Sequence, residues 1–381
     1  MRNRPMLVGF GLGVLLVASA IALAVPSMAG TATKTKRISL SSTGAQGDGD
    51  SRAASISADG RFVAFESSAT NLVGNDTNGK EDVFVRDRRT GKTRRFSVSS
   101  AGAQGDGDSR APSISANGRF VAFRSAATNL VGGDTNASLD VFVGDRRTGK
   151  TKRVSVSSAG VQGNSFSESP SISADGRFVA FESAATNLVG NDSNGFRDVF
   201  VRDRRGGRTK RVSVSSAGAE GNNESRQASI SADGRFVAFR SDATNLVGND
   251  TNGFRDVFVH NLERGKTKRV SVSSAGAQGK GDSSAPSPMS ADGRFVAFDS
   301  AATNLVGGDT NGFSDVFVRD RRTGKTRRFS VSSTGAQGNG DSFAPSISAD
   351  GRFLAFESSA STLVGGDNNG ALDVFVRGPL R

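Results

Sequence analysis

This sequence contains no cysteine, tryptophan or tyrosine and only one histidine, His260. The lack of cysteine excludes disulfides and cysteine nucleophiles, and it leaves the redox compartment undecided. One histidine cannot supply the clustered imidazoles of zinc enzymes, and any Ser-His-Asp triad would have to be built on His260 alone. That position holds arginine in other repeats, at Arg86, Arg202, Arg319 and Arg377, so we interpret His260 as an exposed arginine replaced by histidine. We therefore expect no catalytic residues, and no hydrolase or zinc chemistry.

Phenylalanine supplies all the aromatic bulk, with 26 residues, while glycine is abundant at 48 residues. No aromatic residues are interleaved with the arginine-rich segments as in proteins that bind single-stranded nucleic acid. We therefore expect no nucleic-acid partner. The composition is typical of a strand-rich extracellular protein.

Only one long apolar run is present, and it lies close to the N-terminus after Arg2 and Arg4. The small residues Ser27 and Ala29 follow it and form a signal-peptidase site, so residues 1–29 are predicted to be an export signal. The alternative is an uncleaved anchor, because a run of about 20 apolar residues can span a bilayer. Both interpretations place the rest of the chain outside the cytoplasm, as a secreted, periplasmic or cell-surface protein.

The phrase "ADGRFVAFES" occurs six times with small changes, at intervals of 58 or 59 residues. Its glycines are Gly60, Gly118, Gly176, Gly234, Gly293 and Gly351. One unit of this length buries too little surface to be stable alone, so the units must share a core. Residues 30–381 are therefore predicted to form a single domain of six repeats.

Each unit has the pattern of four short strands without a helix. In the second unit these are Pro112–Ser115, Arg119–Phe123, Asp140–Val143 and Arg153–Ser158, with the tight turn Ala116–Gly118 between the first two. Asn-Gly or Asp-Gly between two such runs is a strong hairpin signal. Six units of four antiparallel strands predict an all-β, six-bladed β-propeller. A solenoid of stacked β-coils is the alternative.

The chain ends favour a closed ring. The last unit stops after Asp373–Arg381 and lacks a fourth strand, whereas Thr35–Ser42 at the other end matches Thr151–Ser158. We therefore predict that residues 35–42 pair with Asp373–Val376 and complete the last blade. An open solenoid has no reason to divide a unit in this way.

The phrases "SADGRFVAFES" and "DVFVRDRRTGKTRRFSV" resemble the propeller repeat of the TolB-like family, a WD-repeat-like group. The resemblance covers all six units. It implies the propeller fold and a general role in binding a protein or polymer. TolB itself has an additional α/β domain before its propeller, where this sequence has only the signal and a few residues.

A further repeated pattern lies between the second and third strands, where each unit has Asp, then Asn two residues later, then Asp four residues after that. The residues are Asp76, Asn78, Asp82, Asp134, Asn136, Asp140, Asp192, Asn194, Asp198, Asp250, Asn252, Asp256, Asp309, Asn311, Asp315, Asp367, Asn369 and Asp373. Closely spaced oxygens on a turn suit calcium, and the segments partly resemble the calcium loops of integrin-type propellers. Calcium is therefore the one candidate cofactor. The alternative is structural, with Asn-Gly forming a turn that the aspartates cap.

The net charge is +12, and the turns between third and fourth strands are rich in arginine. These turns lie on one face of a propeller and the Asp-rich loops on the other, so we predict a disc with a basic face. Its residues are Arg86, Arg88, Arg89, Arg146, Arg147, Arg204, Arg205, Arg321 and Arg322. Such a face attracts anionic polymers or lipid headgroups. If the apolar N-terminus were retained, this face would lie towards the membrane.

Two functions follow from these patterns. The first is an exported, non-catalytic scaffold that binds an envelope protein or an anionic cell-surface polymer. The second is an enzyme that acts on a surface polysaccharide through carboxylates, with calcium as its cofactor. An enzyme should have units whose channel-facing or loop residues break the repeat, whereas a scaffold can be nearly uniform.

Overall fold

A computed structural model of the chain describes residues 35–284 and 289–380. Ile38–Arg381 form one compact unit. The predicted signal, residues 1–29, lies outside the described residues, so the boundary between signal and propeller domain stays a prediction. Within the described ranges, no helix is long and apolar enough to cross a membrane.

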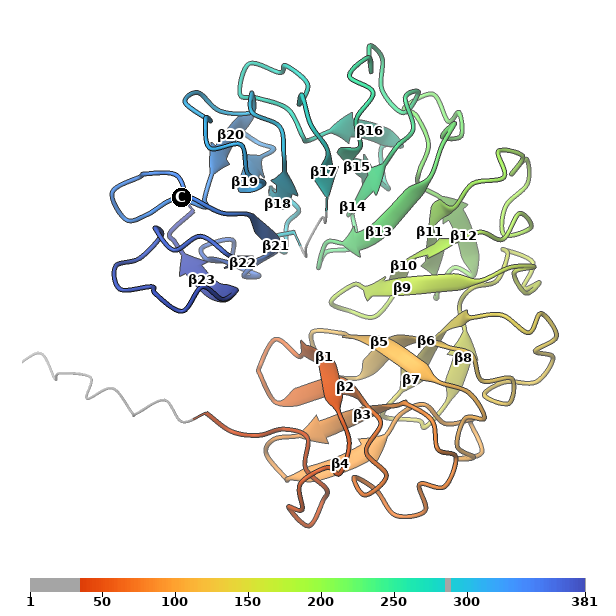
Figure 1. The fold of residues 1–381 in the computed structure, drawn as a ribbon. Coiled ribbons are helices and arrows are strands. Elements are labelled where there is room, and N and C mark those ends of the chain that lie inside the picture. The colour runs from red at the N-terminus through yellow and green to blue at the C-terminus, as the bar shows by residue number, and fades with distance from the viewer. Residues whose placement is uncertain (1–34, 285–288, 381) are drawn as a thin grey trace, which may run out of the picture. The chain divides into compact units, whose positions relative to one another are not determined.

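The unit Ile38–Arg381 consists of six antiparallel sheets that follow one another along the chain (Figure 1). Blade one has β1 (Ser51–Ile56), β2 (Phe62–Ser67), β3 (Asp82–Asp87) and β4 (Lys92–Arg95); blade two has β5 (Ser109–Ile114), β6 (Phe120–Ser125), β7 (Asp140–Asp145) and β8 (Thr151–Arg153). Blade three has β9 (Ser167–Ile172), β10 (Phe178–Ser183), β11 (Asp198–Asp203) and β12 (Arg208–Arg211); blade four has β13 (Ser225–Ile230), β14 (Phe236–Ser241), β15 (Asp256–Asn261) and β16 (Lys266–Arg269). Blade five has β17 (Ser283–Ser284), β18 (Phe295–Ser300), β19 (Asp315–Asp320) and β20 (Lys325–Arg328); blade six has β21 (Ser342–Ile347), β22 (Leu354–Ser358) and β23 (Asp373–Arg377).

In every blade the strands pair in chain order, and the first strand lies nearest the centre of the ring (Figure 1). The described residues contain no helix. The predicted all-β, six-bladed β-propeller is confirmed.

The hydrophobic core lies between neighbouring blades. Phe62 and Val83 of blade one pack in one cluster with Ile114 and Phe123 of blade two, and the same arrangement recurs at the next seams. Within a blade, second and third strands contribute stacked rings such as Phe123 and Phe142, whose centroids are 5.9 Å apart. Because each middle strand is covered on both sides, it is apolar on both faces.

The fourth strands end earlier than predicted. The alternating segment Arg153–Ser158 was expected to be a strand, but β8 ends at Arg153. The Ser155 hydroxyl instead donates to the Asp140 carboxylate (2.6 Å) and accepts from the Val141 N–H (3.1 Å). Serine side chains that bond in this way compete with a strand ladder, so the alternation marks a linker between blades.

The predicted closure of the ring by pairing of residues 35–42 with the last blade is also corrected. In the described part of the chain these residues form no ladder with β23, and the sixth sheet has three strands. Leu40 and Ser42 instead contact blade one, where the Thr93 hydroxyl donates to the Leu40 carbonyl (2.5 Å) and the Thr93 N–H donates to the Ser42 hydroxyl (2.9 Å). Linker residues Val98 and Ser100 make the same bonds with the equivalent threonine of blade two.

Blade six is therefore less covered than the others. Val374 and Val376 on β23 are 72% and 70% exposed, whereas the equivalent Val316 and Val318 of blade five are 0% and 4% exposed. Ile56 on β1 is also exposed, at 57%. These three residues lack the packing that the other seams provide.

Candidate functional site

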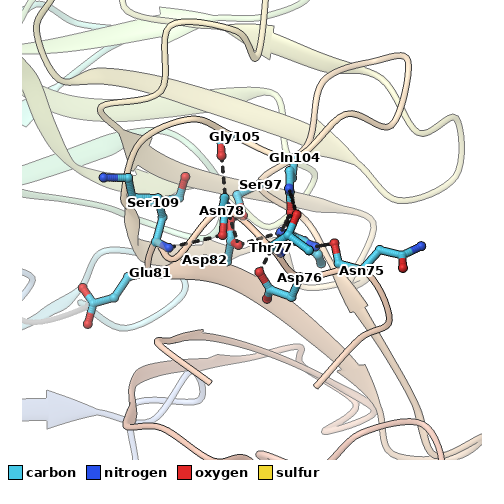
Figure 2. Close-up of polar contacts among 12 residues, drawn as sticks. Asn75, Asp76, Thr77, Asn78, Glu81, Asp82, Ser97, Gln104, Gly105 and Ser109 are labelled. Carbon is cyan, nitrogen blue, oxygen red and sulfur yellow. Dashed lines mark hydrogen bonds and ion pairs between the residues drawn. The ribbon is translucent and has the colours of Figure 1, made fainter. Parts of the chain in front are cut away.

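The Asp/Asn loops are rigid turns. In blade one the Asn78 side-chain amide donates to the Asp82 carboxylate (3.1 Å) and to the Gly105 carbonyl (2.9 Å), as Figure 2 shows. The Asn78 side-chain oxygen accepts from the Lys80 N–H (3.2 Å). Asp82 is fully buried at the start of β3 and accepts from the Ser97 hydroxyl (2.5 Å). The loop is therefore tied to the following linker and to its own blade.

In blades one to five the aspartates of the loop hold a buried arginine. In blade one the Arg95 guanidinium lies 3.2 Å from the Asp76 carboxylate and 2.9 Å from the Asp82 carboxylate. The equivalent arginines are Arg153, Arg211, Arg269 and Arg328. Sequence reasoning missed these arginines, although each one ends the fourth strand at a fixed distance after its loop.

This arrangement leaves little room for calcium. Burial raises the pKa of Asp192 to about 6, with Arg211 acting in the opposite direction. In five blades both aspartates already share a cation, and the oxygens of the second also accept bonds from serine and either asparagine or glutamine. In the described residues no group of three or more His, Cys, Asp or Glu side chains could hold a metal. A divalent ion would have to displace the guanidinium, so calcium binding stays a prediction that these contacts do not favour.

The predicted basic residues fall into three environments. The first is a slot at the seam between blades, where the Arg86 guanidinium donates to the carbonyls of Leu40 (2.8 Å) and Ser41 (3.0 Å) and to the Thr93 hydroxyl (2.8 Å). Arg202 makes equivalent bonds. Arg86 is thus a structural residue of the seam.

His260 occupies this slot in blade four, and the prediction that it is exposed is wrong. It is only 6% exposed, and its Nδ1 lies 2.9 Å from the Thr267 hydroxyl oxygen. Burial lowers the pKa of His260 to about 4, and Lys210 adds to this effect. The imidazole is therefore neutral at pH 7 and replaces one bond of the arginine.

A second group crosses the seams. The guanidinium carbons of Arg146, Arg204 and Arg321 lie 3.8, 4.4 and 4.2 Å from the ring centroids of phenylalanines in the preceding blade. Burial lowers the pKa of all three. Arg88 belongs to the same position in blade one and donates to the Gly60 carbonyl (2.5 Å).

The third group is exposed at the periphery of the propeller. It combines the turn residues Arg89, Arg147, Arg205 and Arg322 with basic residues on and beside the fourth strands. The latter, which we call the basic rim, are Lys92, Arg94, Lys150, Lys152, Arg208, Lys210, Lys266, Lys268, Lys325 and Arg327. In the described part of the chain no rim residue forms an ion pair.

The aspartates of the same hairpins do not neutralise the rim, because other arginines hold them. Asp203 accepts from Arg177 through both Nε (3.0 Å) and Nη2 (2.7 Å), and this hydrogen bonding lowers the pKa of Asp203 to about 2. Asp87, Asp145 and Asp320 have equivalent partners. The rim therefore carries uncompensated positive charge.

Residues that differ between units gather at the start of the inner strands. The equivalent positions there are Arg52, Arg110, Glu168, Arg226, Ser284 and Phe343. Glu81 pairs with Arg52 (3.0 Å) and Arg110, and Glu168 pairs with Arg197 (3.1 Å) and Arg124. A position-by-position comparison of the six units could have identified this cluster, which sequence reasoning did not single out.

One carboxyl group near this cluster, that of Asp299, has a raised pKa. Burial raises the pKa of Asp299 on β18 to about 7, with its own N–H, Arg240 and the Ala344 N–H acting in the opposite direction. The protonated form is favoured in the folded state, so ionisation between pH 4 and 7 destabilises the fold. The side chain of Asp299→Asn cannot ionise, so we expect this variant to be more stable than the native protein by about 2 kcal/mol at pH 8. One pKa unit corresponds to about 1.4 kcal/mol, and the partial exposure of Asp299 reduces the effect.

Thermal unfolding followed by circular dichroism at pH 4 and pH 8 measures this effect. The gain should disappear at pH 4. Asp50→Asn is the control, because the Asp50 side chain is 87% exposed. An equal melting temperature for Asp299→Asn and native protein at pH 8 would contradict the raised pKa.

No protein-family model and no curated protein matches this chain. Among solved structures it is similar to TolB from Acinetobacter baumannii, with 16% identity and a TM-score of 0.41 over 74% of this chain and 54% of that one. It is also similar to a protein named as TolB from Agrobacterium tumefaciens, with 13% identity and a TM-score of 0.44 over 87% and 90% of the two chains. The β-propeller domain of the Trilobed protease from Pyrococcus furiosus has 9% identity and a TM-score of 0.50 over 86% and 81%.

These similarities concern the fold. The chain spans about half of the A. baumannii TolB structure, 54% of its length. The similarity to the propeller domain of the Trilobed protease agrees with the β-propeller fold, and the resemblance of the repeat to the TolB-like family stays a prediction from the sequence.

Proposed function

We propose that this protein is an exported, non-catalytic propeller scaffold that binds an anionic partner at the cell envelope. The partner is an envelope protein or an anionic surface polymer. The basic rim carries the proposal, because its lysines and arginines repeat in five blades and have no acidic partners among the described residues. Charges of one sign on neighbouring blades favour a partner that meets several of them at once.

Export is supported by the sequence of residues 1–29. The two early arginines, the apolar run and the small residues before Gly30 have the order of a secretory signal. An envelope location also explains why the positive charges would meet anionic polymers rather than nucleic acid.

A non-catalytic role is supported by the state of the carboxylates. Glu81 before β3 and Glu168 on β9 each form ion pairs with two arginines, so neither carboxylate is without a partner. Glycoside hydrolysis uses two carboxyl groups on either side of the bond. Asp299 and Asp192, whose raised pKa values of about 7 and about 6 would suit acid–base chemistry, belong to different blades and do not form such a pair.

Retention on immobilised polyphosphate at increasing salt tests the rim. We expect the variant Lys92→Gln/Arg94→Gln/Lys210→Gln/Lys268→Gln/Arg327→Gln to elute at lower salt than the native protein. An exposed ion pair contributes roughly 0.2–1 kcal/mol, so the loss of five should weaken binding by about tenfold or more.

The matched control is Lys80→Gln/Lys280→Gln, which removes exposed lysines from the loops and linkers on the opposite face. Its elution should stay close to that of the native protein. The rim variant removes five positive charges and the control two, so elution shifts proportional to the number of charges removed would mean that charge acts through its net value only and that the rim is not the binding surface.

A further inference from the structure

A groove of about 390 Å³ lies between blades two and three, on the face that carries the Asn117–Gly118 and Arg204–Arg205 turns. Its lining includes Asp175 as well as Arg119, Phe120, Arg177, Arg204 and Arg205. Four arginines and one aspartate therefore line a single concave site, and the arginines that no carboxylate holds by hydrogen bonds are the ones available to a ligand.

Two of the four arginines are neutralised. Arg119 donates to the Asp145 carboxylate (3.0 and 2.7 Å), and Arg177 donates to the Asp203 carboxylate in the same way. Arg205 lies 3.7 Å from the Asp175 carboxylate, at an exposed position. Arg204 forms no ion pair with any described residue.

Arg204 is held in place without a counter-ion. Its guanidinium carbon lies 4.4 Å from the centroid of the Phe120 ring, and the guanidinium donates to the Gly176 carbonyl. Burial lowers the pKa of Arg204, although the nearby carboxylates of Asp145 and Asp175 act in the opposite direction. A guanidinium has five N–H donors in a planar fork that matches phosphate oxygens, so an oxyanion in the groove would stabilise the cation.

We propose that this groove is a phosphate-binding site, in which Arg204 and Arg205 bind the oxyanion. This inference rests on the proposed function and names the ligand: a polymer that carries repeated phosphates.

The same pair recurs at two more seams. Arg146 lies at the seam between blades one and two, in a groove of about 270 Å³ that is also lined by Asp87, Lys92 and Arg94, and Arg147 follows it in the exposed turn. Arg321 and Arg322 occupy the seam between blades four and five. Three arginine pairs at corresponding sequence positions around one ring suit a chain of regularly spaced anions better than a single small ion.

The seam between blades three and four provides an internal control. Leu262 and Glu263 stand there in place of the arginine pair, in a groove of about 430 Å³. The hairpin there also has Asn261 in place of the aspartate equivalent to Asp203, and Glu263 lies 3.1 Å from Arg235, so this groove offers no arginine at either assigned position.

Calorimetric titration of the purified protein with inorganic tripolyphosphate at low salt tests the assignment. The native protein should bind about three per chain. Arg204→Leu/Arg205→Glu, which copies the blade-four pair, should remove one site. Leu262→Arg/Glu263→Arg should add one site. The gain does not depend on the stability of the first variant, so a folding defect cannot produce both results.

Unchanged stoichiometry in both variants would overturn the groove assignment. If those variants behave as the native protein while the rim variant loses retention on polyphosphate, the rim binds the polymer and only the grooves are misassigned. If the native protein binds no tripolyphosphate but is retained on polyphosphate, the groove assignment fails and the proposed function stands. If it is not retained on polyphosphate either, the rim proposal for polymers fails as well.

Discussion

Arg211→Met is expected to lose about 3–5 kcal/mol of unfolding free energy at pH 8, since removing one partner of a buried ion pair leaves an uncompensated charge. The Arg211 guanidinium lies 3.0 Å from the carboxylates of both Asp192 and Asp198 and 2.8 Å from that of Glu220. Its side chain is only 8% exposed. Methionine fills a similar volume, so the loss reports mainly on charge.

The loss should depend on pH. Burial already raises the pKa of Asp192 and of Asp198, and Arg211 opposes this in both cases. Without the arginine both pKa values rise further above those of the unfolded chain. The folded state then binds more protons than the unfolded state, so stability falls as pH rises from about 4 through these pKa values. The deficit of Arg211→Met should therefore be smaller at pH 5 than at pH 8.

Urea denaturation at the two pH values measures the effect, and Lys210→Met is the matched control. Lys210 precedes Arg211 on β12, is exposed and forms no ion pair with a described residue. Its substitution should change the unfolding free energy by less than about 0.5 kcal/mol. Equal losses in the two variants would show that the loop arginines do not stabilise the blades through charge.

The fold could be predicted because the pattern repeats. The turn residues before Arg119–Phe123 and the apolar middle strands identify a hairpin in each unit, and six copies define a propeller. The predicted fourth strand extends past its observed end, because Ser155 and its equivalents alternate with apolar residues as in a strand. Their hydroxyls bond aspartates and backbone of the third strand, a contact that no local pattern shows.

The candidate site was predicted only in part. The turns of the Asp/Asn loops were identified from composition, but their cation was taken to be calcium because Arg95 lies 19 residues after Asp76 and on another strand. The basic residues illustrate the same limit. Arg86, Arg88 and Arg89 lie within four residues of one another but have different environments. Arg86 is hydrogen-bonded in the seam slot, Arg88 occupies the position whose arginine crosses a seam in other blades, and Arg89 is exposed. Only the packing of neighbouring blades separates these roles.

Gly176→Ala is expected to destabilise the protein by about 3 kcal/mol. Gly176 has a φ of +70°, which costs an L-residue roughly 1–2 kcal/mol. A Cβ at this position would lie 2.2 Å from the Cδ2 atom of Phe120. The ring cannot move away freely, because the Arg204 guanidinium stacks on it. Overpacking of this kind adds about 1–3 kcal/mol.

Gly195→Ala separates the two contributions. Gly195 has a φ of +72°, but a Cβ there would meet no atom within 4 Å. Urea denaturation should therefore show only the backbone cost, about 1 kcal/mol, for this variant. The difference between the two variants measures how tightly the seam holds Phe120. Since the same ring supports Arg204, Gly176→Ala should also weaken tripolyphosphate binding at the groove between blades two and three, whereas Gly195→Ala should not. Equal stability losses in the two variants would mean that the seam yields, and that the position of Arg204 is not fixed by packing.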